Sequence, residues 1–150
     1  MTPPTVRALV GRVVPALDPS VTLAAAAAAL AGGGWEALPV VRRGVLLGLV
    51  LADDLAAARP SAATTLTIAE TAGALSRITV ESIVRRDVPT IVPTTPIAEA
   101  ARLLRDGAPP LPVLEDGRVV GLVGVADVLA LFDVGEGGAG PELHDLVIKR

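Results

Sequence analysis

The feature that most constrains this chain is an internal duplication. The segment that begins at Thr5 matches the segment that begins at Thr79, and the stretch from Ala37 matches the stretch from Pro110. A sequence that repeats itself in this way predicts two copies of one supersecondary unit. The identical pairs include Val6 and Val80, Val10 and Val84, Arg12 and Arg86, Pro15 and Pro89, Leu30 and Leu104, Gly48 and Gly121, and Asp54 and Asp127.

A helix is most clearly predicted in the second copy. Thr95 is expected as its N-cap and Pro96 as its first residue, because hydroxyl caps and an early proline favour a helix start. Gly107 is expected to end it. Four apolar residues recur at helical spacing and predict one buried face: Ile97, Ala100, Ala101 and Leu104.

A β-hairpin is predicted after this helix. Residues 111–114 and 118–123 form the two strands, and the second strand is a continuous apolar run that favours burial on both faces. Residues 115–117, Glu-Asp-Gly, form the turn, with Gly117 placed for a positive φ. A last helix is predicted over residues 126–132. Each copy therefore has the order β-α-β-β-α after a short opening helix, and the fold class is α/β (α+β).

The duplication also predicts how the chain is divided. We expect the first repeat over residues 5–58 and the second over residues 79–133. Residues 59–78 are interpreted as a linker and lead-in, because Ser, Thr and Ala dominate the stretch. Residues 134–150 follow a glycine-rich break and are interpreted as a flexible C-terminal tail.

Composition excludes several classes of protein. With 51% hydrophobic and 19% charged residues, the chain is expected to fold and not to be disordered. Its net charge of -3 disfavours nucleic acid. The chain has no Cys and one His, so it offers no disulfide, thiolate metal site or histidine cluster. No apolar run reaches the roughly 18 residues of a membrane span, and the N-terminus is unlike a signal peptide. We therefore expect a soluble cytoplasmic protein.

The repeated pattern resembles the CBS domain. The pattern reads V-P-x-hydrophobic-x-P, then a helix, then L-P-V-hydrophobic, then G-hydrophobic-V-x-x-x-D-hydrophobic. Two copies in tandem look like a Bateman module. The resemblance implies two units packed about a pseudo-twofold axis, with two clefts between the paired sheets. Such clefts commonly bind adenosine-containing ligands.

The resemblance also implies a function. It suggests a stand-alone regulatory module that binds AMP, ADP, ATP or S-adenosylmethionine, forms a homodimer and signals to an unidentified effector protein. An enzyme is not expected, because no glycine-rich phosphate loop, HExxH or G-x-S-x-G motif is present. No cofactor is required. The alternative is a structural or dimerisation module that binds no nucleotide.

Two carboxylates carry the ligand-binding hypothesis. The resemblance places ribose contacts at Asp54 and Asp127, and a carboxylate accepts two hydrogen bonds from a cis-diol. The alternative is that both residues only stabilise a helix start. Leu51 and Gly124 stand where adenylate-binding members usually carry Ser or Thr. Leu51 would face a charged group with an apolar wall, whereas Gly124 lets backbone approach, so the cleft of Asp127 is favoured.

The base pocket implied by the resemblance lies along two strands of each copy. Backbone groups there could read an adenine edge between aliphatic walls, and the alternative is that these residues only fill the core. Thr90 has a hydroxyl that its counterpart Ala16 lacks. The candidates are Leu17, Leu38, Pro39, Val40, Thr90, Ile91, Leu111, Pro112 and Val113.

Four further residues bear on the charge of the two ends or on ligand contacts. Arg42 and Arg43 lie in a turn whose counterpart is Glu115-Asp116, so the two ends differ in charge. Arg12 is one candidate for a phosphate contact. Trp35 precedes a strand, where packing is favoured over stacking on a ligand.

Overall fold

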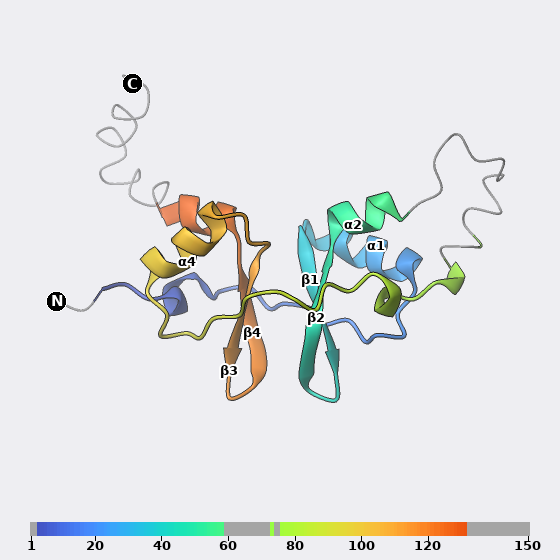
Figure 1. The fold of residues 1–150 in the computed structure, drawn as a ribbon, viewed down its shortest axis with the longest axis horizontal. Helices are drawn as coiled ribbons and strands as arrows, with labels where there is room; N and C mark the ends of the chain where they lie inside the picture. Colours follow the sequence, from blue (N-terminus) through green and yellow to red (C-terminus); the bar gives the residue numbers. More distant parts are fainter. Residues whose placement is uncertain (1–2, 59–72, 74–75, 132–150) are drawn as a thin grey trace, which may run out of the picture.

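The architecture is two similar halves that lie side by side, as Figure 1 shows. The computed structural model describes residues 3–58, 73 and 76–131. Each half holds one antiparallel hairpin with a pair of helices at one end of it, and an approximate twofold axis relates the halves (Figure 1). The expected mixed α and β architecture is therefore confirmed. The predicted tail and most of the predicted linker lie outside the described residues.

The elements follow the same order in both copies. The first copy contains the 3-10 helix η1 (Val6–Leu9), α1 (Leu23–Gly33), β1 (Ala37–Arg42), β2 (Val45–Leu51) and α2 (Ala52–Ala57). The second contains the 3-10 helix η2 (Val80–Ser82), α4 (Ile97–Arg105), β3 (Leu111–Glu115), β4 (Arg118–Val123) and a helix over residues 125–131. Among the described residues, no helix combines the length and apolar character that crossing a bilayer requires.

Both hairpins are closed by two-residue turns of the same kind. Arg43 and Gly44 have φ values of 53° and 81°, and Asp116 and Gly117 have values of 53° and 78°. Positive φ at both central positions defines the type I′ turn, whose twist matches that of the strands. The turn predicted over residues 115–117 is thus present.

The helix α4 begins one residue later than predicted. Pro96 takes the N-cap position, and Thr95 does not cap the helix. The Thr95 hydroxyl instead accepts the Val92 N–H at 3.0 Å, because this bond closes the turn before the helix. Ile97 and the other residues of the predicted apolar face point inward, and Ala101 alone is half-buried.

The first strand predicted in each copy is reduced to a single bridging residue. Leu17 pairs with Val40, and Ile91 pairs with Val113. The Leu17 N–H donates to Pro39 O at 2.8 Å. Prolines lie two residues to either side of each bridging residue, and a proline has no N–H for a ladder. This explains why pairing cannot extend into a strand.

The two halves exchange their opening segments. Val6 is fully buried in the core of the second half, and its N–H donates to Thr95 O at 2.9 Å. Val80 is fully buried in the core of the first half, and its N–H donates to Val21 O at 2.8 Å. Each sequence repeat is therefore divided between both halves in space.

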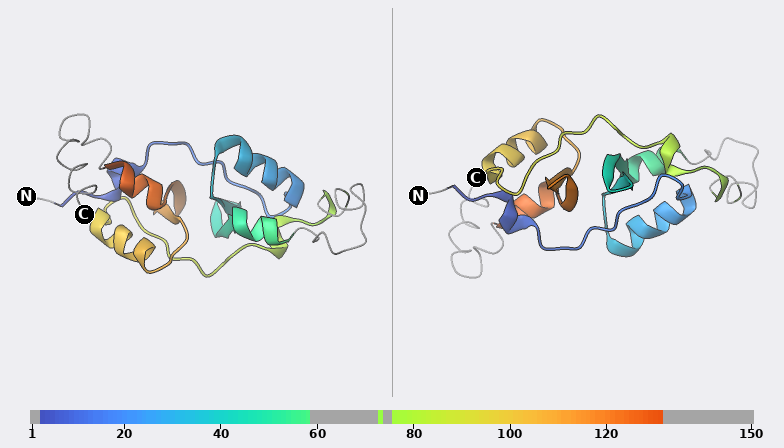
Figure 2. Two further views of the ribbon diagram at one scale, coloured as in Figure 1. Left: turned by 90° about the horizontal axis from the view of Figure 1, so that it is seen from above. Right: turned by 90° about the horizontal axis from the view of Figure 1, so that it is seen from below.

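The exchange sends two connecting segments between the halves. The segments that follow η1 and η2 run from one half to the other along opposite sides of the molecule (Figure 2). The core of the first half consists of Leu17, Leu23, Ala26, Leu30, Leu38, Val40, Val50, Leu55 and Val80. The core of the second consists of Val6, Ile91, Ile97, Ala100, Leu104, Leu111, Val113 and Val123. Neither core is complete without a residue from the other repeat.

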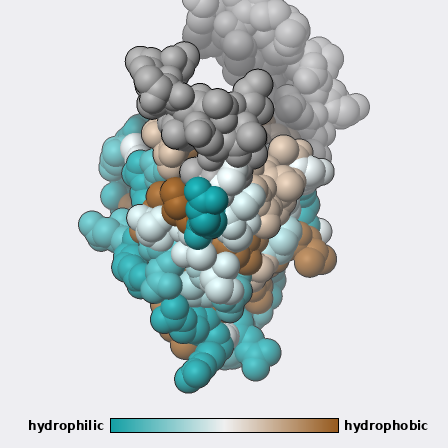
Figure 3. Space-filling view, turned by 90° about the vertical axis from the view of Figure 1, so that its right-hand side faces the viewer, coloured by the Kyte–Doolittle hydropathy of each residue, from teal (hydrophilic) through white to brown (hydrophobic). Residues whose placement is uncertain are grey.

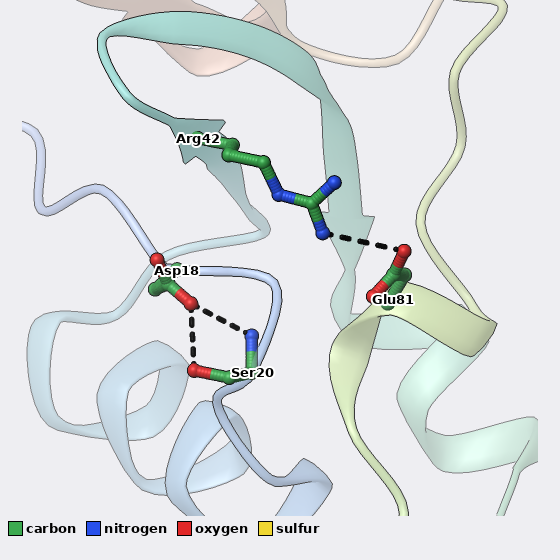
Figure 4. Close-up of polar contacts among 4 residues, drawn as sticks. All are labelled: Asp18, Ser20, Arg42 and Glu81. Carbon is green, nitrogen blue, oxygen red and sulfur yellow. Dashed lines mark hydrogen bonds and ion pairs between the residues drawn. The ribbon is translucent and has the colours of Figure 1, made fainter.

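An ion pair joins each hairpin turn to the exchanged segment beside it. Arg42 lies 3.4 Å from Glu81 (Figure 4), and Arg7 lies 3.2 Å from Glu115. The duplication makes Arg42 the counterpart of Glu115, and Glu81 the counterpart of Arg7. The charge inversion noted at the turns is thus matched by an inversion of their partners. Arg42 is consequently paired with a carboxylate, and it lies outside the residues that line the cavity described below.

A compact turn beside the Arg42 pair leads into α1. The Asp18 carboxylate accepts hydrogen bonds from the Ser20 hydroxyl at 2.6 Å and from the Ser20 N–H at 2.9 Å (Figure 4). The bond from the hydroxyl and then that from the N–H hold the pKa of Asp18 below its usual value. The Thr22 hydroxyl then caps α1 by accepting the Ala25 N–H at 3.1 Å. Around this end of the molecule, hydrophilic residues gather toward the hairpin turn (Figure 3).

Candidate functional site

A cavity of about 160 Å³ lies where the two halves meet beside Asp127. The first repeat supplies the segment after η1 and the loop from α1 into β1. The second supplies the end of β4 and the start of the helix over residues 125–131. The lining comprises residues 9–12, 14, 34–37, 110, 121, 122, 124, 126 and 127. Any ligand here would touch both repeats.

Asp127 combines two roles at this cavity. Its Oδ2 accepts the Gly124 N–H at 2.7 Å, while its own N–H donates to Gly124 O at 3.1 Å. This reciprocal pair satisfies groups at the helix start, which is the capping role considered from the sequence. The residue is only half-buried, and it also lines the cavity. Its carboxylate is therefore positioned to accept hydrogen bonds from a ligand as well.

A second carboxylate, that of Glu36, also lies close to Gly124. A Cβ built on Gly124 would lie 3.7 Å from Asp127 Oδ2 and 3.9 Å from Glu36 Oε2. Glu36 is not among the site residues predicted from the sequence. Its counterpart in the second copy is Pro109, so a comparison of the copies could have shown a charge on one side only.

Arg12 and Trp35 form one wall of the cavity together. The Arg12 guanidinium carbon lies 3.9 Å from the centroid of the Trp35 ring, and Arg12 Nη2 donates to Gly33 O at 2.8 Å. A cation over an indole ring is an attractive arrangement that holds both groups in place. Trp35 was expected to pack, and it does so while lining the cavity.

The other predicted site residues lie away from this cavity. Asp127 and Gly124 are in its lining, whereas the base-pocket candidates are not. Thr90 is exposed, and Leu17 and Ile91 are buried at the bridging positions. The strand candidates are also buried, in the two cores, which is the alternative weighed from the sequence: Leu38, Pro39, Val40, Leu111, Pro112 and Val113.

Asp54 occupies the position equivalent to Asp127 but has a different partner. Arg85 Nε donates to Asp54 Oδ2 at 2.6 Å, and Arg85 Nη2 donates to Asp54 Oδ1 at 2.8 Å. These hydrogen bonds, together with the charge of the guanidinium, hold the pKa of Asp54 below its usual value against the raising effect of desolvation. The two aspartates of the duplication are therefore not equivalent in their surroundings.

The comparisons with known proteins agree on the architecture. The CBS domain family model matches residues 6–61 and 80–133. The CBS domain of a CBS domain containing membrane protein from Sphaerobacter thermophilus is 25% identical, with a TM-score of 0.70 over 87% of this chain and 88% of that one. A CBS domain-containing protein from Bacillus anthracis is 21% identical, with a TM-score of 0.72 over 87% and 93%.

One similar structure contains ligands. A CBS domain pair in complex with 5′-methylthioadenosine and S-adenosyl-L-methionine is 24% identical, with a TM-score of 0.69 over 88% of this chain and 98% of that one. Among curated proteins, no match to this chain is found.

Two equivalent glycines should respond differently to alanine. A Cβ on Gly48 would collide with the backbone carbonyl of Arg85, whereas a Cβ on Gly121 would meet the Val10 side chain at 2.9 Å. The Val10 side chain can shift to make room, whereas the hydrogen-bonded backbone of Arg85 cannot. We expect Gly48→Ala to lower the free energy of unfolding by about 2–3 kcal/mol, and Gly121→Ala by about 1 kcal/mol or less. Denaturant unfolding measures both, and equal losses would contradict the prediction.

The pKa of Asp54 predicts an acid-dependent loss of stability. Because the folded-state pKa is lower than the unfolded one, the contribution of this group is present above about pH 4 and is lost as the pH falls through the folded value. The melting temperature of the wild-type protein should therefore fall more steeply below about pH 5 than that of Asp54→Asn. Arg85→Met should likewise reduce the fall in melting temperature at low pH. The double variant Asp54→Asn/Arg85→Met should show the same pH profile as either single variant. Parallel profiles for all four proteins would rule out the coupling.

Proposed function

The chain belongs to the CBS domain family as a tandem pair, and from this premise we propose that it binds an adenosine-containing ligand in the cleft beside Asp127. It is a CBS-pair module of the regulatory kind, and proteins of this family are generally non-catalytic. The observation that carries the proposal is the Asp127 carboxylate at a cavity built from both repeats. A similar CBS pair in complex with 5′-methylthioadenosine and S-adenosyl-L-methionine supports it.

The cleft offers a contact for each part of a nucleoside. The Asp127 carboxylate suits the ribose diol, because an ionised acceptor forms strong hydrogen bonds with hydroxyl donors. Trp35, Leu9 and Leu122 offer apolar surface to a base. The cavity is smaller than the roughly 300–1,000 Å³ of typical ligand pockets, so part of the ligand would extend outside it.

The charges around the cavity favour some adenosine ligands over others. Glu36 and Asp127 both line it, and Arg12 is the cation in the lining. Two carboxylates repel a chain of phosphates, since like charges a few ångströms apart interact by several kcal/mol at an effective dielectric of about 20. We therefore propose that the cleft favours adenosine compounds with a neutral or cationic substituent, such as S-adenosylmethionine, over ATP.

Binding would provide a signal because the cavity spans the two repeats. Residues 34–37 come from the first repeat and residues 121–127 from the second. A ligand with better contacts in one arrangement of these segments shifts the population toward it. We propose that an effector protein in the cytoplasm reads this shift.

Dimerisation is a further part of the proposal. An apolar groove of about 200 Å³ runs between α4 and the helix over residues 125–131. Val125 is 51% exposed and Leu129 is 55% exposed along this helix. Apolar side chains gathered in this way are typical of interfaces. We propose that a second copy of the chain covers them, and Leu129→Glu should then convert a dimer to a monomer in sedimentation velocity. Equal sedimentation of both proteins would refute this.

A melting-temperature panel tests the ligand proposal. S-adenosylmethionine, adenosine, AMP and ATP are each added to the wild-type protein, to Asp127→Ala and to Asp54→Ala. A ligand at about 100 times its Kd should add roughly 2.7 kcal/mol, which is a rise of about 5 °C for a protein of this size. The rise should disappear in Asp127→Ala and persist in Asp54→Ala. No rise with any compound would favour the structural alternative, to which the missing hydroxyls at Leu51 and Gly124 already point.

The role of Glu36 predicts a change in ligand preference. Glu36→Gln removes one negative charge from the lining, so the affinity for ATP should rise by roughly tenfold, equivalent to about 1.4 kcal/mol, with little change for S-adenosylmethionine. Glu99→Gln, on the exposed side of α4, is the matched control and should change neither affinity. Isothermal titration calorimetry measures both constants. A ratio of affinities that Glu36→Gln leaves unchanged would argue against this charge selection.

A further inference from the structure

We propose that Arg85 blocks ligand binding beside Asp54, the position equivalent to Asp127, so that each chain binds one ligand and not two. The proposal rests on the proposed function for its choice of ligand. It concerns the half of the duplication that contains Asp54.

The Asp54 carboxylate, which would accept hydrogen bonds from a ribose on this side of the molecule, is already paired with Arg85. Both oxygens of Asp54 accept hydrogen bonds from the Arg85 guanidinium, at 2.6 and 2.8 Å. The Asp54 side chain is 24% exposed, so most of it is covered. A bidentate guanidinium–carboxylate pair adds the attraction of opposite charges to its two hydrogen bonds, and a neutral ribose diol does not supply that attraction. A ribose therefore replaces Arg85 at a disadvantage.

The backbone holds Arg85 at this position. The Leu49 N–H donates to Arg85 O at 2.9 Å, and the Arg85 N–H donates to Leu49 O at 2.8 Å. The absence of a side chain at Gly48 allows this close approach. The connecting segment is thus tied to β2 on this side, and the guanidinium projects from an anchored residue.

On the side of Asp127, the position equivalent to Arg85 has no side chain that could pair with the carboxylate. Gly11 is the counterpart of Arg85, and Leu122 is the counterpart of Leu49. Both Gly11 and Leu122 line the cavity beside Asp127. A glycine at this position cannot pair with Asp127, and the neighbouring Arg12 guanidinium lies over Trp35 and donates to Gly33 O. The Asp127 carboxylate thus stays available to a ligand.

Other substitutions between the copies fit the same assignment. The counterparts of Trp35 and Glu36 are Ala108 and Pro109, so the side of Asp54 has neither the indole nor the second carboxylate. Leu51 precedes Asp54 at the start of α2 and has no hydroxyl to offer. The residues that would hold a ligand are thus concentrated on the side of Gly11.

Calorimetric stoichiometry tests the proposal directly. S-adenosylmethionine and AMP are titrated into the wild-type protein, Arg85→Met and Gly11→Arg. Arg85→Met keeps the backbone bridge and a side chain of similar length while it removes the guanidinium. Gly11→Arg places a guanidinium beside Asp127, and nothing within 4 Å obstructs a Cβ at this position. Arg43→Met, at the hairpin turn, is the control for loss of an exposed arginine.

We expect one binding site per chain in the wild-type protein and in Arg43→Met, and two sites in Arg85→Met. In Gly11→Arg, the site beside Asp127 should bind ligand at least tenfold more weakly. Two sites in the wild-type protein, or one unchanged site in Arg85→Met, would overturn the proposal and leave the proposed function intact. No binding to the wild-type protein but one site in Arg85→Met would support the block beside Asp54 and refute the site beside Asp127. No binding to either protein would refute both.

Discussion

The exchange of opening segments is the interaction on which the other features depend. Val6 completes the core of the second half and Val80 completes that of the first, and each is held by backbone hydrogen bonds to its new neighbours. Because each repeat begins in one half and continues in the other, a stretch of chain must pass between the halves on each side (Figure 2). These stretches form part of the cleft walls. Residues 9–12 line the open cavity, and Arg85 lies in the corresponding segment opposite.

The duplication provides a symmetric scaffold with asymmetric chemistry. Two equivalent ion pairs show this, Arg42 with Glu81 and Arg7 with Glu115. Each charge in one pair is replaced by the opposite charge in the other, so both pairs remain attractive and the contact is kept. The pair of Asp54 with Arg85 has no such counterpart, because Gly11 stands opposite Asp127. The ion pairs at the hairpin turns are thus kept in both copies, while Gly11, Trp35 and Glu36, which line the cavity beside Asp127, differ from their counterparts. The proposed function rests on these differences between the copies.

Local patterns allowed the architecture to be predicted, and tertiary contacts explain the rest. The hairpin turn and the apolar face of α4 follow from nearby residues, so they were predictable. The start of α4 was one residue off because the Thr95 hydroxyl accepts the Val92 N–H instead. Apart from the exposed Thr90, the base-pocket candidates are buried, since a resemblance in sequence cannot tell a buried wall from a ligand-facing one. A comparison of the copies could have shown Glu36, whereas Arg85 required knowledge of the exchange, which no periodicity reveals.

The exchange also has a consequence for how the chain is made. The hydrogen bond from Val6 to Thr95 joins residues that are far apart in the sequence, and Val80 must reach Val21 in the same way. Contacts of this kind close large loops and slow folding, because loop entropy is lost before the contacts form. While the ribosome is still adding the second repeat, the first has no Val80 to seal its core. The first half can therefore complete its core only after Val80 has left the ribosome, although every other residue of that core lies before residue 59.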